Sequence, residues 1–378
     1  MIKLDKEKKT FLLLCLLPIL AFFSIGFYSS PTISRAVLLV ESGVFFLLFL
    51  LNLSLIRGWQ RWGAIAASLI SVFVTLLSHS GIGIALSFFN LLVSILLFNN
   101  LAISKKRKKL LHLLSAAPLL LLYLISNVGV AGGGGAMLDF SGYSLNPNVV
   151  GMLWLAVFFH AFCYVNLMKI SKIKRLMCLC ACTVISACVI CLTGCRSAII
   201  SLVIFLGLLW LCRLYKGEIP YSHYKTASLV ILCSSLLFTF VYVRLSHRFD
   251  DVTVLGKELF TGREIVWQSA YGLISESFLF GNGTDLLLDT VEGAKTTSAH
   301  NMLLSFWYTL GFVPTLIVTV LFVNRVRNKS EYKRDRVTQV ALISSLFICF
   351  FESFLADSSL QIFFSLFLIS NICKEEAE

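Results

Sequence analysis

Three basic side chains stand out because each lies at the start of an apolar or helical segment. Arg196 follows "LTGC" and begins an apolar run, Arg263 lies in "TGRE", and His300 begins another apolar run in "SAHNMLL". The first backbone N–H groups of a helix carry partial positive charge, and guanidinium groups bind phosphate oxygens in pairs. If these helix starts converge, the site would suit a multiply charged anion such as a diphosphate.

A further helix start strengthens this hypothesis. In "NPN", Asn146 can cap a helix and Pro147 can take its first position, which places Asn148 in the first turn. Each basic residue also has an ordinary interpretation: Arg263 as a solvated arginine, and His300 as an exposed histidine at a helix end. Taken together, with a structured loop between them, they favour a site.

The segments around these residues are those of a polytopic membrane protein. The chain has 378 residues, of which 58% are hydrophobic and 14% charged, too apolar for a soluble multidomain protein. A spanning helix needs about 20 mostly apolar residues. We therefore predict an all-α fold with about twelve spans, at residues 10–28, 33–56, 62–79, 81–103, 110–127, 147–168, 175–193, 196–215, 225–243, 301–323, 337–354 and 357–373.

The distribution of Lys and Arg predicts the orientation of the spans. With the N-terminus inside, alternate connections place 25 of the 32 basic residues on the cytoplasmic side, as the positive-inside rule requires. Both termini are then cytoplasmic, and the net charge of +12 need not mean nucleic-acid binding. The outer side receives seven basic residues: Arg35, Arg196, Arg244, Arg248, Lys257, Arg263 and Lys295.

The long connection at residues 244–299, between the ninth and tenth predicted spans, is extracytoplasmic in this topology. Long loops with structure of their own commonly carry function. "TGRE" matches a capping box with Thr261 as the cap and Glu264 three residues later, before a helical apolar stripe. We expect an amphipathic helix on the membrane surface, followed by a turn at "GNGTD". The whole of 1–378 is otherwise one transmembrane domain.

Other clusters have simpler interpretations. Six cysteines between Cys178 and Cys195 crowd one predicted helix, and we interpret them as small packing residues, because no His or carboxylate joins them at metal-ligand spacing. "GGGG" is interpreted as a flexible loop. Glu41 lies inside a span, and Glu352 and Asp357 flank the last outer turn, where Arg196 or Arg35 could pair with them. For these three carboxylates we favour structural ion pairing over catalysis.

Four ordered segments resemble the bacterial O-antigen ligase and O-antigen polymerase family. They are "LNPNVVGMLWLA", "LTGCRSAIISLVIF", "FTGREIVWQSAYGLISESFLFGNGTD" and "SAHNMLLSFWYTLGFVPTLI". The resemblance covers about residues 145–321, with Cys195 standing where "TGSRSA" is commoner. It implies a metal-independent glycosyltransferase of GT-C-type architecture in the bacterial cytoplasmic membrane, without a cofactor, whose active site faces outward.

Such enzymes transfer a glycan from undecaprenyl diphosphate to an acceptor sugar hydroxyl. Fixed arginines can stabilise the departing diphosphate, and a histidine is a natural base near neutral pH. We therefore predict Arg196 and Arg263 as the diphosphate clamp and His300 as the base, with Asn301 orienting the imidazole or the sugar. The further substrate-binding candidates are Arg244, Arg248, Asn148 and Glu264, with Asp139 another carboxylate that could contact sugars.

The expected partners are the undecaprenyl-diphosphate-linked oligosaccharide, the acceptor glycan, the lipid bilayer, a chain-length regulator and a flippase, but no nucleic acid. Polymerisation of surface-polysaccharide repeats is favoured over ligation to lipid A-core, because the compact outer loop offers little surface for a large acceptor. A transporter or flippase would also have about twelve spans, but two-halved permeases have internal repeats and a long central connection. The sequence has neither feature. A non-catalytic scaffold would not need arginines placed against the charge bias.

Overall fold

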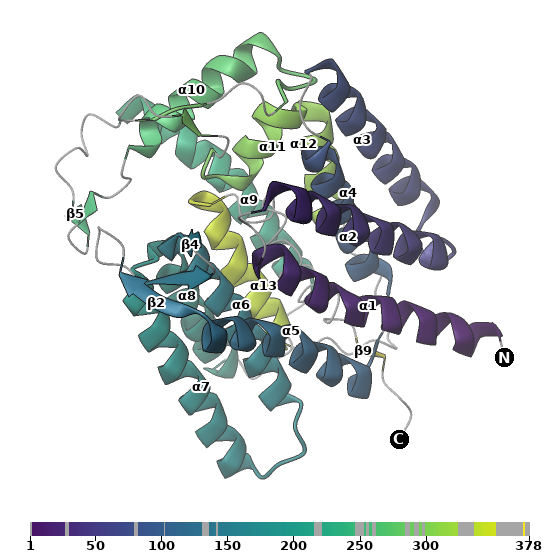
Figure 1. Ribbon diagram of the computed structural model, residues 1–378, viewed down its shortest axis with the longest axis vertical. Helices are drawn as coiled ribbons and strands as arrows, with labels where there is room; N and C mark the ends of the chain where they lie inside the picture. Colours follow the sequence, from purple (N-terminus) through teal and green to yellow (C-terminus); the bar gives the residue numbers. More distant parts are fainter. Residues whose placement is uncertain are drawn as a thin grey trace.

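A computed structural model gives the fold of the protein (Figure 1). It describes residues 2–26, 30–78, 82–101, 103–130, 136–140, 143–214, 221–245, 253–254, 257–258, 262–283, 288–290, 295–296, 299–323, 336–352 and 373–374. The predicted span at 357–373 falls almost entirely outside these residues, as do Arg248, Thr261 and Asp357.

Helices make up most of the described chain. They are α1 (Ile2–Gly26), α2 (Pro31–Asn52), α3 (Gly58–Leu77), α4 (Gly83–Asn100), α5 (Lys105–Ile125), α6 (Pro147–Asn166), α7 (Lys172–Thr193), α8 (Arg196–Leu214), α9 (Tyr221–Leu245), α10 (Arg263–Glu276), α11 (Met302–Leu310), α12 (Phe312–Val323), α13 (Arg336–Leu346) and the 3-10 helix η2 (Phe347–Phe350).

Eight helices in the described part of the chain are long and apolar enough to cross a membrane: α1, α2, α3, α5, α6, α7, α8 and α9. The protein is therefore a multipass membrane protein. Three further predicted spans correspond to shorter apolar helices, at Gly83–Phe98, Phe312–Val323 and Gln339–Phe350.

The predicted tenth span, residues 301–323, is two helices. Gly311 separates α11 from α12 and has φ 90°, a left-handed value that favours glycine. A Cβ at this position would overlap the carbonyl of Leu279. Phe312 N donates to the carbonyl of Phe278 at 3.0 Å, so the segment after α10 replaces a helical partner at the break. Apolar periodicity cannot reveal such a break, because the side chains on both sides are equally apolar.

The predicted outer connection at residues 128–146 contains a small sheet. Strands β2 (Asn127–Val130), β3 (Ala136–Phe140) and β4 (Tyr143–Leu145) pair antiparallel in the order β2-β3-β4. The remaining strands have two residues each: β1 (Ile103–Ser104) with β9 (Cys373–Lys374), β5 (Thr253–Val254) with β6 (Lys257–Glu258), and β7 (Leu288–Asp289) with β8 (Lys295–Thr296). Short strands in connections thus accompany the predicted helical fold.

Helix α6 is the most buried of the eight long helices, because α5, α7 and α8 pack around it. Phe158 and Phe162 of α6 pack against Phe205 of α8, with ring centroids 5.4 and 5.1 Å apart. Helix α7 is largely exposed instead, and it carries Cys178, Cys180, Cys188 and Cys191 on its outside. The interpretation of the cysteine cluster as packing residues is therefore wrong for these four.

Helix α10 lies at one end of the molecule and packs on α9 and α11 (Figure 1). Its buried residues are Val266, Trp267, Ala270 and Ile274. Three of these belong to the apolar stripe expected from the sequence, which omitted the fully buried Trp267. The N-cap position is occupied by Gly262, with φ 76° and no side-chain cap bond. The predicted capping box with Thr261 as the cap is therefore wrong, because the helix begins one residue later, after a left-handed glycine.

Candidate functional site

A single buried carboxylate joins two of the predicted site residues. Glu352, just after η2, accepts a hydrogen bond from Arg263 Nη2 to Oε1 at 2.7 Å. His300 Nδ1 lies 3.2 Å from the other oxygen, Oε2. The Glu352 side chain is 8% exposed, against 15% for Arg263 and 35% for His300. Three segments far apart in the sequence thus meet in a group that we call the Glu352 cluster: Arg263, His300 and Glu352. The imidazole is the most accessible of its three side chains.

Arg196 is positioned by a tight corner between α7 and α8. Gly194 ends α7 with φ 64°, and the next residue, Cys195, donates its backbone N–H to Thr193 Oγ1 at 3.2 Å. The Cys195 thiol donates to the carbonyl of Asn148 at 3.4 Å, which brings the starts of α6 and α8 together. A Cβ at Gly151 would overlap Cys195 Cβ. Glycine at 151 therefore permits the close approach that places Arg196 at the first position of α8.

The charges of these residues are coupled. Arg196 is half-buried and lies within electrostatic range of Arg263 and Glu352. Burial alone would raise the pKa of the Glu352 carboxyl, but the Arg263 guanidinium and the His300 imidazole outweigh it, so the pKa is lowered. Glu352 is therefore a carboxylate, and a carboxylate only accepts hydrogen bonds. It follows that His300 Nδ1 is the donor in the His300–Glu352 bond.

His300 has a backbone conformation that is uncommon for a residue other than glycine. Its φ is 48°, which makes it the one non-glycine residue with positive φ in the described part of the chain. Strain of this kind persists when the surroundings hold it in place, and it is common at functional sites. Here the preceding residue, Ala299, accepts from Trp267 Nε1 at 2.8 Å and donates its N–H to Ser305 Oγ at 3.2 Å. The main chain before the imidazole is thus fixed to α10 and α11.

Asn301 fixes the main chain on the other side of His300. It is fully buried, and its Oδ1 accepts from Leu304 N at 3.0 Å as the N-cap of α11. Its Nδ2 donates to the carbonyls of Ser235, at 3.3 Å, and Phe350, at 3.4 Å. The bonded Asn301 amide therefore supports the position of the imidazole through the backbone. In this arrangement it does not face an open surface where a sugar could bind.

The other predicted binding residues lie at different distances from this cluster. Glu264 is half-buried in the first turn of α10, next to Arg263, and Asn148 touches the Cys195 corner through its carbonyl. Arg244 is exposed in the last turn of α9, with its guanidinium 5.6 Å from the ring centre of Phe240. Glu264 is therefore adjacent in sequence to Arg263, and Asn148 bonds to Cys195, the residue before Arg196. Arg244 lies on the exterior.

Glu352 belongs to the candidate site by its contacts, although from the sequence we favoured only structural ion pairing for it. We expected it to pair with Arg196 or Arg35, yet its oxygens bond to Arg263 and His300, and Arg35 is exposed on α2. The available signal was a carboxylate that directly follows an apolar run. Glu41 had the same signal, but both of its oxygens lack a hydrogen-bond partner among the described residues. The expected structural ion pair of Glu41 is therefore not found there.

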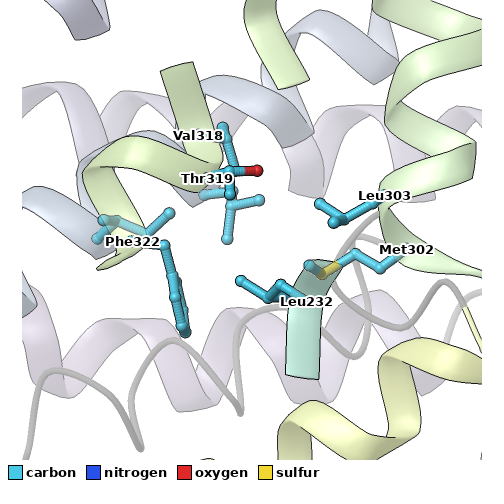
Figure 2. A pocket seen from close by; sticks show the side chains of 8 residues that line it. Leu232, Met302, Leu303, Val318, Thr319 and Phe322 are labelled. Carbon is cyan, nitrogen blue, oxygen red and sulfur yellow. The ribbon is translucent and has the colours of Figure 1, made fainter. Parts of the chain in front are cut away.

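Neither Cys195 nor a small cavity beside α11 offers a group that could accept a proton from a sugar hydroxyl at neutral pH. Burial raises the pKa of the Cys195 thiol to about 11, so this cysteine is protonated at neutral pH. A small cavity next to α11 is lined by Leu91, Ile95, Leu232, Met302, Leu303, Val318, Thr319 and Phe322 (Figure 2). Thr319 is the one polar residue in this lining. The cavity is therefore an apolar space within the helix bundle, distinct from the Glu352 cluster.

A comparison with protein families gives one match. Residues 181–319 match the family described as O-Antigen ligase. This range contains Arg196, Arg263 and His300, whereas Glu352 and Asn148 lie outside it. A comparison with curated proteins gives no match.

Proposed function

Residues 181–319 form an O-antigen ligase domain, and on this premise we propose that the protein is a glycosyltransferase acting on the outer face of the bacterial cytoplasmic membrane. The family consists of glycosyltransferase-type enzymes that use lipid-linked donors. In our proposal the donor is an undecaprenyl-diphosphate-linked glycan and the acceptor is a sugar hydroxyl. The observation that carries the proposal is the meeting of Arg263 and His300 on the Glu352 carboxylate, with Arg196 in electrostatic range.

The proposed reaction is a substitution at the anomeric carbon of the donor. The acceptor oxygen forms a bond to this carbon while the bond from the carbon to the diphosphate oxygen breaks. The acceptor proton passes to the His300 imidazole, and the diphosphate leaves with the bonding electrons. Arg196 and Arg263 stabilise the negative charge on the leaving group. In this scheme the arginines supply the charge stabilisation, and no metal or cofactor is required.

The outward orientation is part of the proposal. The Lys and Arg distribution favours cytoplasmic termini, and this orientation places the starts of α6 and α8 on the outer side. The lipid bilayer would then hold the prenyl chain of the donor, and the diphosphate would lie at the membrane surface. Arg244 and Arg248 remain candidates for contacts with the lipid diphosphate in this scheme. The GT-C-type architecture and the loop assignment at residues 244–299 also belong to this proposal.

The direct test is transfer by purified protein in lipid vesicles that contain a polyprenyl-diphosphate glycan. We expect release of the free carrier and a lengthened or attached glycan. Arg263→Gln should lower kcat by about 10²–10³, the cost of removing one preorganised charge-stabilising donor. The control is Arg35→Gln, because Arg35 is an exposed arginine on α2. Full transfer by Arg263→Gln, or movement of the glycan lipid across the bilayer without carrier release, would contradict the proposal.

We favour polymerisation of surface-polysaccharide repeats as the reaction in the cell, because the outer connections are compact. Ligation to a terminal acceptor such as lipid A-core is the second candidate, and the description of the matched family favours it. The two differ in the glycans left in a deletion strain. Single repeats on the carrier or the cell surface indicate a polymerase, whereas full-length unattached chains indicate a ligase. A chain-length regulator and a flippase are expected partners in the polymerase case.

A further inference from the structure

We infer that Glu352 is a positioning residue that selects the reactive nitrogen of His300 and orients the imidazole, an inference that rests on the proposed function. Glu352 lies outside the matched domain, 52 residues after His300. It is held in the Arg263–Glu352–His300 chain by bonds of 2.7 and 3.2 Å. Glu352 is the least exposed of these three residues. It therefore acts on the acceptor through His300.

The bonds of the Glu352 carboxylate determine the tautomer of the imidazole. The Arg263 guanidinium always donates, and it occupies Oε1 of the carboxylate. Because Glu352 is ionised, His300 Nδ1 must carry a proton to bond to Oε2. In the neutral ring the other nitrogen, Nε2, is then the basic atom. The acceptor proton passes to Nε2, while the Nδ1 proton stays on its bond to Glu352.

The Glu352 carboxylate also fixes the orientation of the imidazole. His300 has a strained backbone, with φ 48°, and its imidazole is the most exposed group of the cluster. Asn301 and Ala299 fix the main chain, but the side chain needs its own anchor to stay in one rotamer. The Glu352 carboxylate supplies that anchor, and Arg263 holds the carboxylate in turn. The base is therefore connected to one arginine of the proposed diphosphate clamp through a single side chain.

This inference predicts a specific failure in Glu352→Gln. Glutamine offers one carbonyl oxygen to two donors, Arg263 and His300 Nδ1. If the amide NH₂ faces the imidazole, Nδ1 must accept and the ring proton moves to Nε2, which removes the basic nitrogen. We expect kcat to fall by about 10²–10⁴, the range for loss of acid–base assistance. KM for the donor should stay the same or fall, because Arg263 loses its carboxylate partner.

The closing experiment is a double-mutant cycle on vesicle-reconstituted protein with a polyprenyl-diphosphate glycan, normalised to folded protein by size-exclusion chromatography. The variants are Glu352→Gln, His300→Gln, the double variant, and Glu276→Gln as a control at the exposed end of α10. If Glu352 acts through His300, Glu352→Gln lowers kcat in the wild-type background but not in the His300→Gln background.

Each outcome of the cycle has a distinct meaning. Two results overturn the positioning role. One is a double variant whose loss of kcat equals the product of the two single losses. The other is an unchanged kcat in Glu352→Gln while His300→Gln is slow. An unchanged rate in His300→Gln overturns the proposed base itself, which is a separate failure. If Glu352→Gln does not fold, Glu352→Asp takes its place in the cycle, because it keeps the charge on a shorter side chain. Its rate should lie between those of wild type and His300→Gln, and a loss that persists in the His300→Gln background again overturns the inference.

Discussion

Two polar sites in the described part of the protein contain histidine, and their surroundings differ. His300 is partly exposed and lies between a carboxylate and the main-chain anchors of α10 and α11. His112 of α5 and His160 of α6 are fully buried, with their Nδ1 atoms 3.0 Å apart. Lys108, also fully buried, lies in electrostatic range of His112. One histidine therefore has an ionised carboxylate and a path to solvent, whereas the others have basic neighbours and no exposed surface.

The difference separates two uses of a polar group in a membrane protein. A histidine that accepts a proton from a substrate needs access and a partner that fixes its tautomer, and His300 has both. The His112–His160 pair joins α5 to α6 inside the bundle, where a side-chain hydrogen bond helps to set how two helices pack. Position inside an apolar segment does not distinguish these roles. Accessibility and the sign of the neighbouring charge do.

The largest expected effect comes from His300→Gln. Loss of the base should lower kcat by about 10²–10⁴ without loss of folded protein. Transfer from a polyprenyl-diphosphate glycan, measured in vesicles, is the readout. His223→Gln is the matched control, because His223 is an exposed histidine on α9. If the two variants transfer at equal rates, the distinction between the clusters is wrong.

A smaller effect is expected from Asn301→Ala. The substitution removes the N-cap of α11 and the bonds to Ser235 and Phe350, so the imidazole should shift. A displacement near 1 Å can cost about 10²-fold in rate. Asn301→Asp keeps the capping oxygen and should recover part of the rate. A direct contact between Asn301 and the sugar would instead show as a large rise in the acceptor KM with kcat preserved.

The smallest effect on transfer is expected from His160→Ala, in the buried pair. It removes the bonding partner of His112 Nδ1 and should lower the free energy of unfolding by about 1–3 kcal/mol. The rate per folded molecule should be unchanged. Thermal unfolding in detergent, run beside the transfer assay, separates the two quantities. A loss of rate without loss of stability would give this cluster a functional role and remove the contrast with His300.

Much of the helical fold was predictable because the length of an apolar run is a local property of the chain. The bounds of α6, α7 and α8 lie within a few residues of the predicted spans. The break at Gly311 has a local signal that we missed, a glycine followed by Pro314. The close approach of the Leu279 carbonyl, a contact between segments distant in sequence, has no such signal. The β2-β3-β4 sheet was also missed, although its pairings are local: Val130 pairs with Ala136, and Phe140 pairs with Tyr143.

The candidate site was predictable in part for the same reason. Arg196, Arg263 and His300 each have a local signal, a basic residue at a helix start. The local signal of Glu352, a carboxylate at the end of an apolar run, does not identify His300 as its bonding partner, because Glu352 reaches the imidazole only when η2 packs beside α9 and α11. Asn301 did carry a local signal, since an asparagine before an apolar run is a typical N-cap. We expected it to orient the imidazole or the sugar, and in the structure its amide bonds to the protein backbone beside His300.

Helix α11 has only nine residues, and both of its ends are tied. At its start Asn301 caps the first turn, and at its end the carbonyls of Tyr308 and Thr309 accept from Asn282 N and Gly283 N, at 2.8 and 2.9 Å. Hydrogen bonds therefore hold the segment that follows α10 against the helix that carries His300 at its start. An engineered chimera with a foreign loop would have to reproduce the two amide donors at 282 and 283. A graft that ignored them would misplace the imidazole even if every residue of the Glu352 cluster were kept.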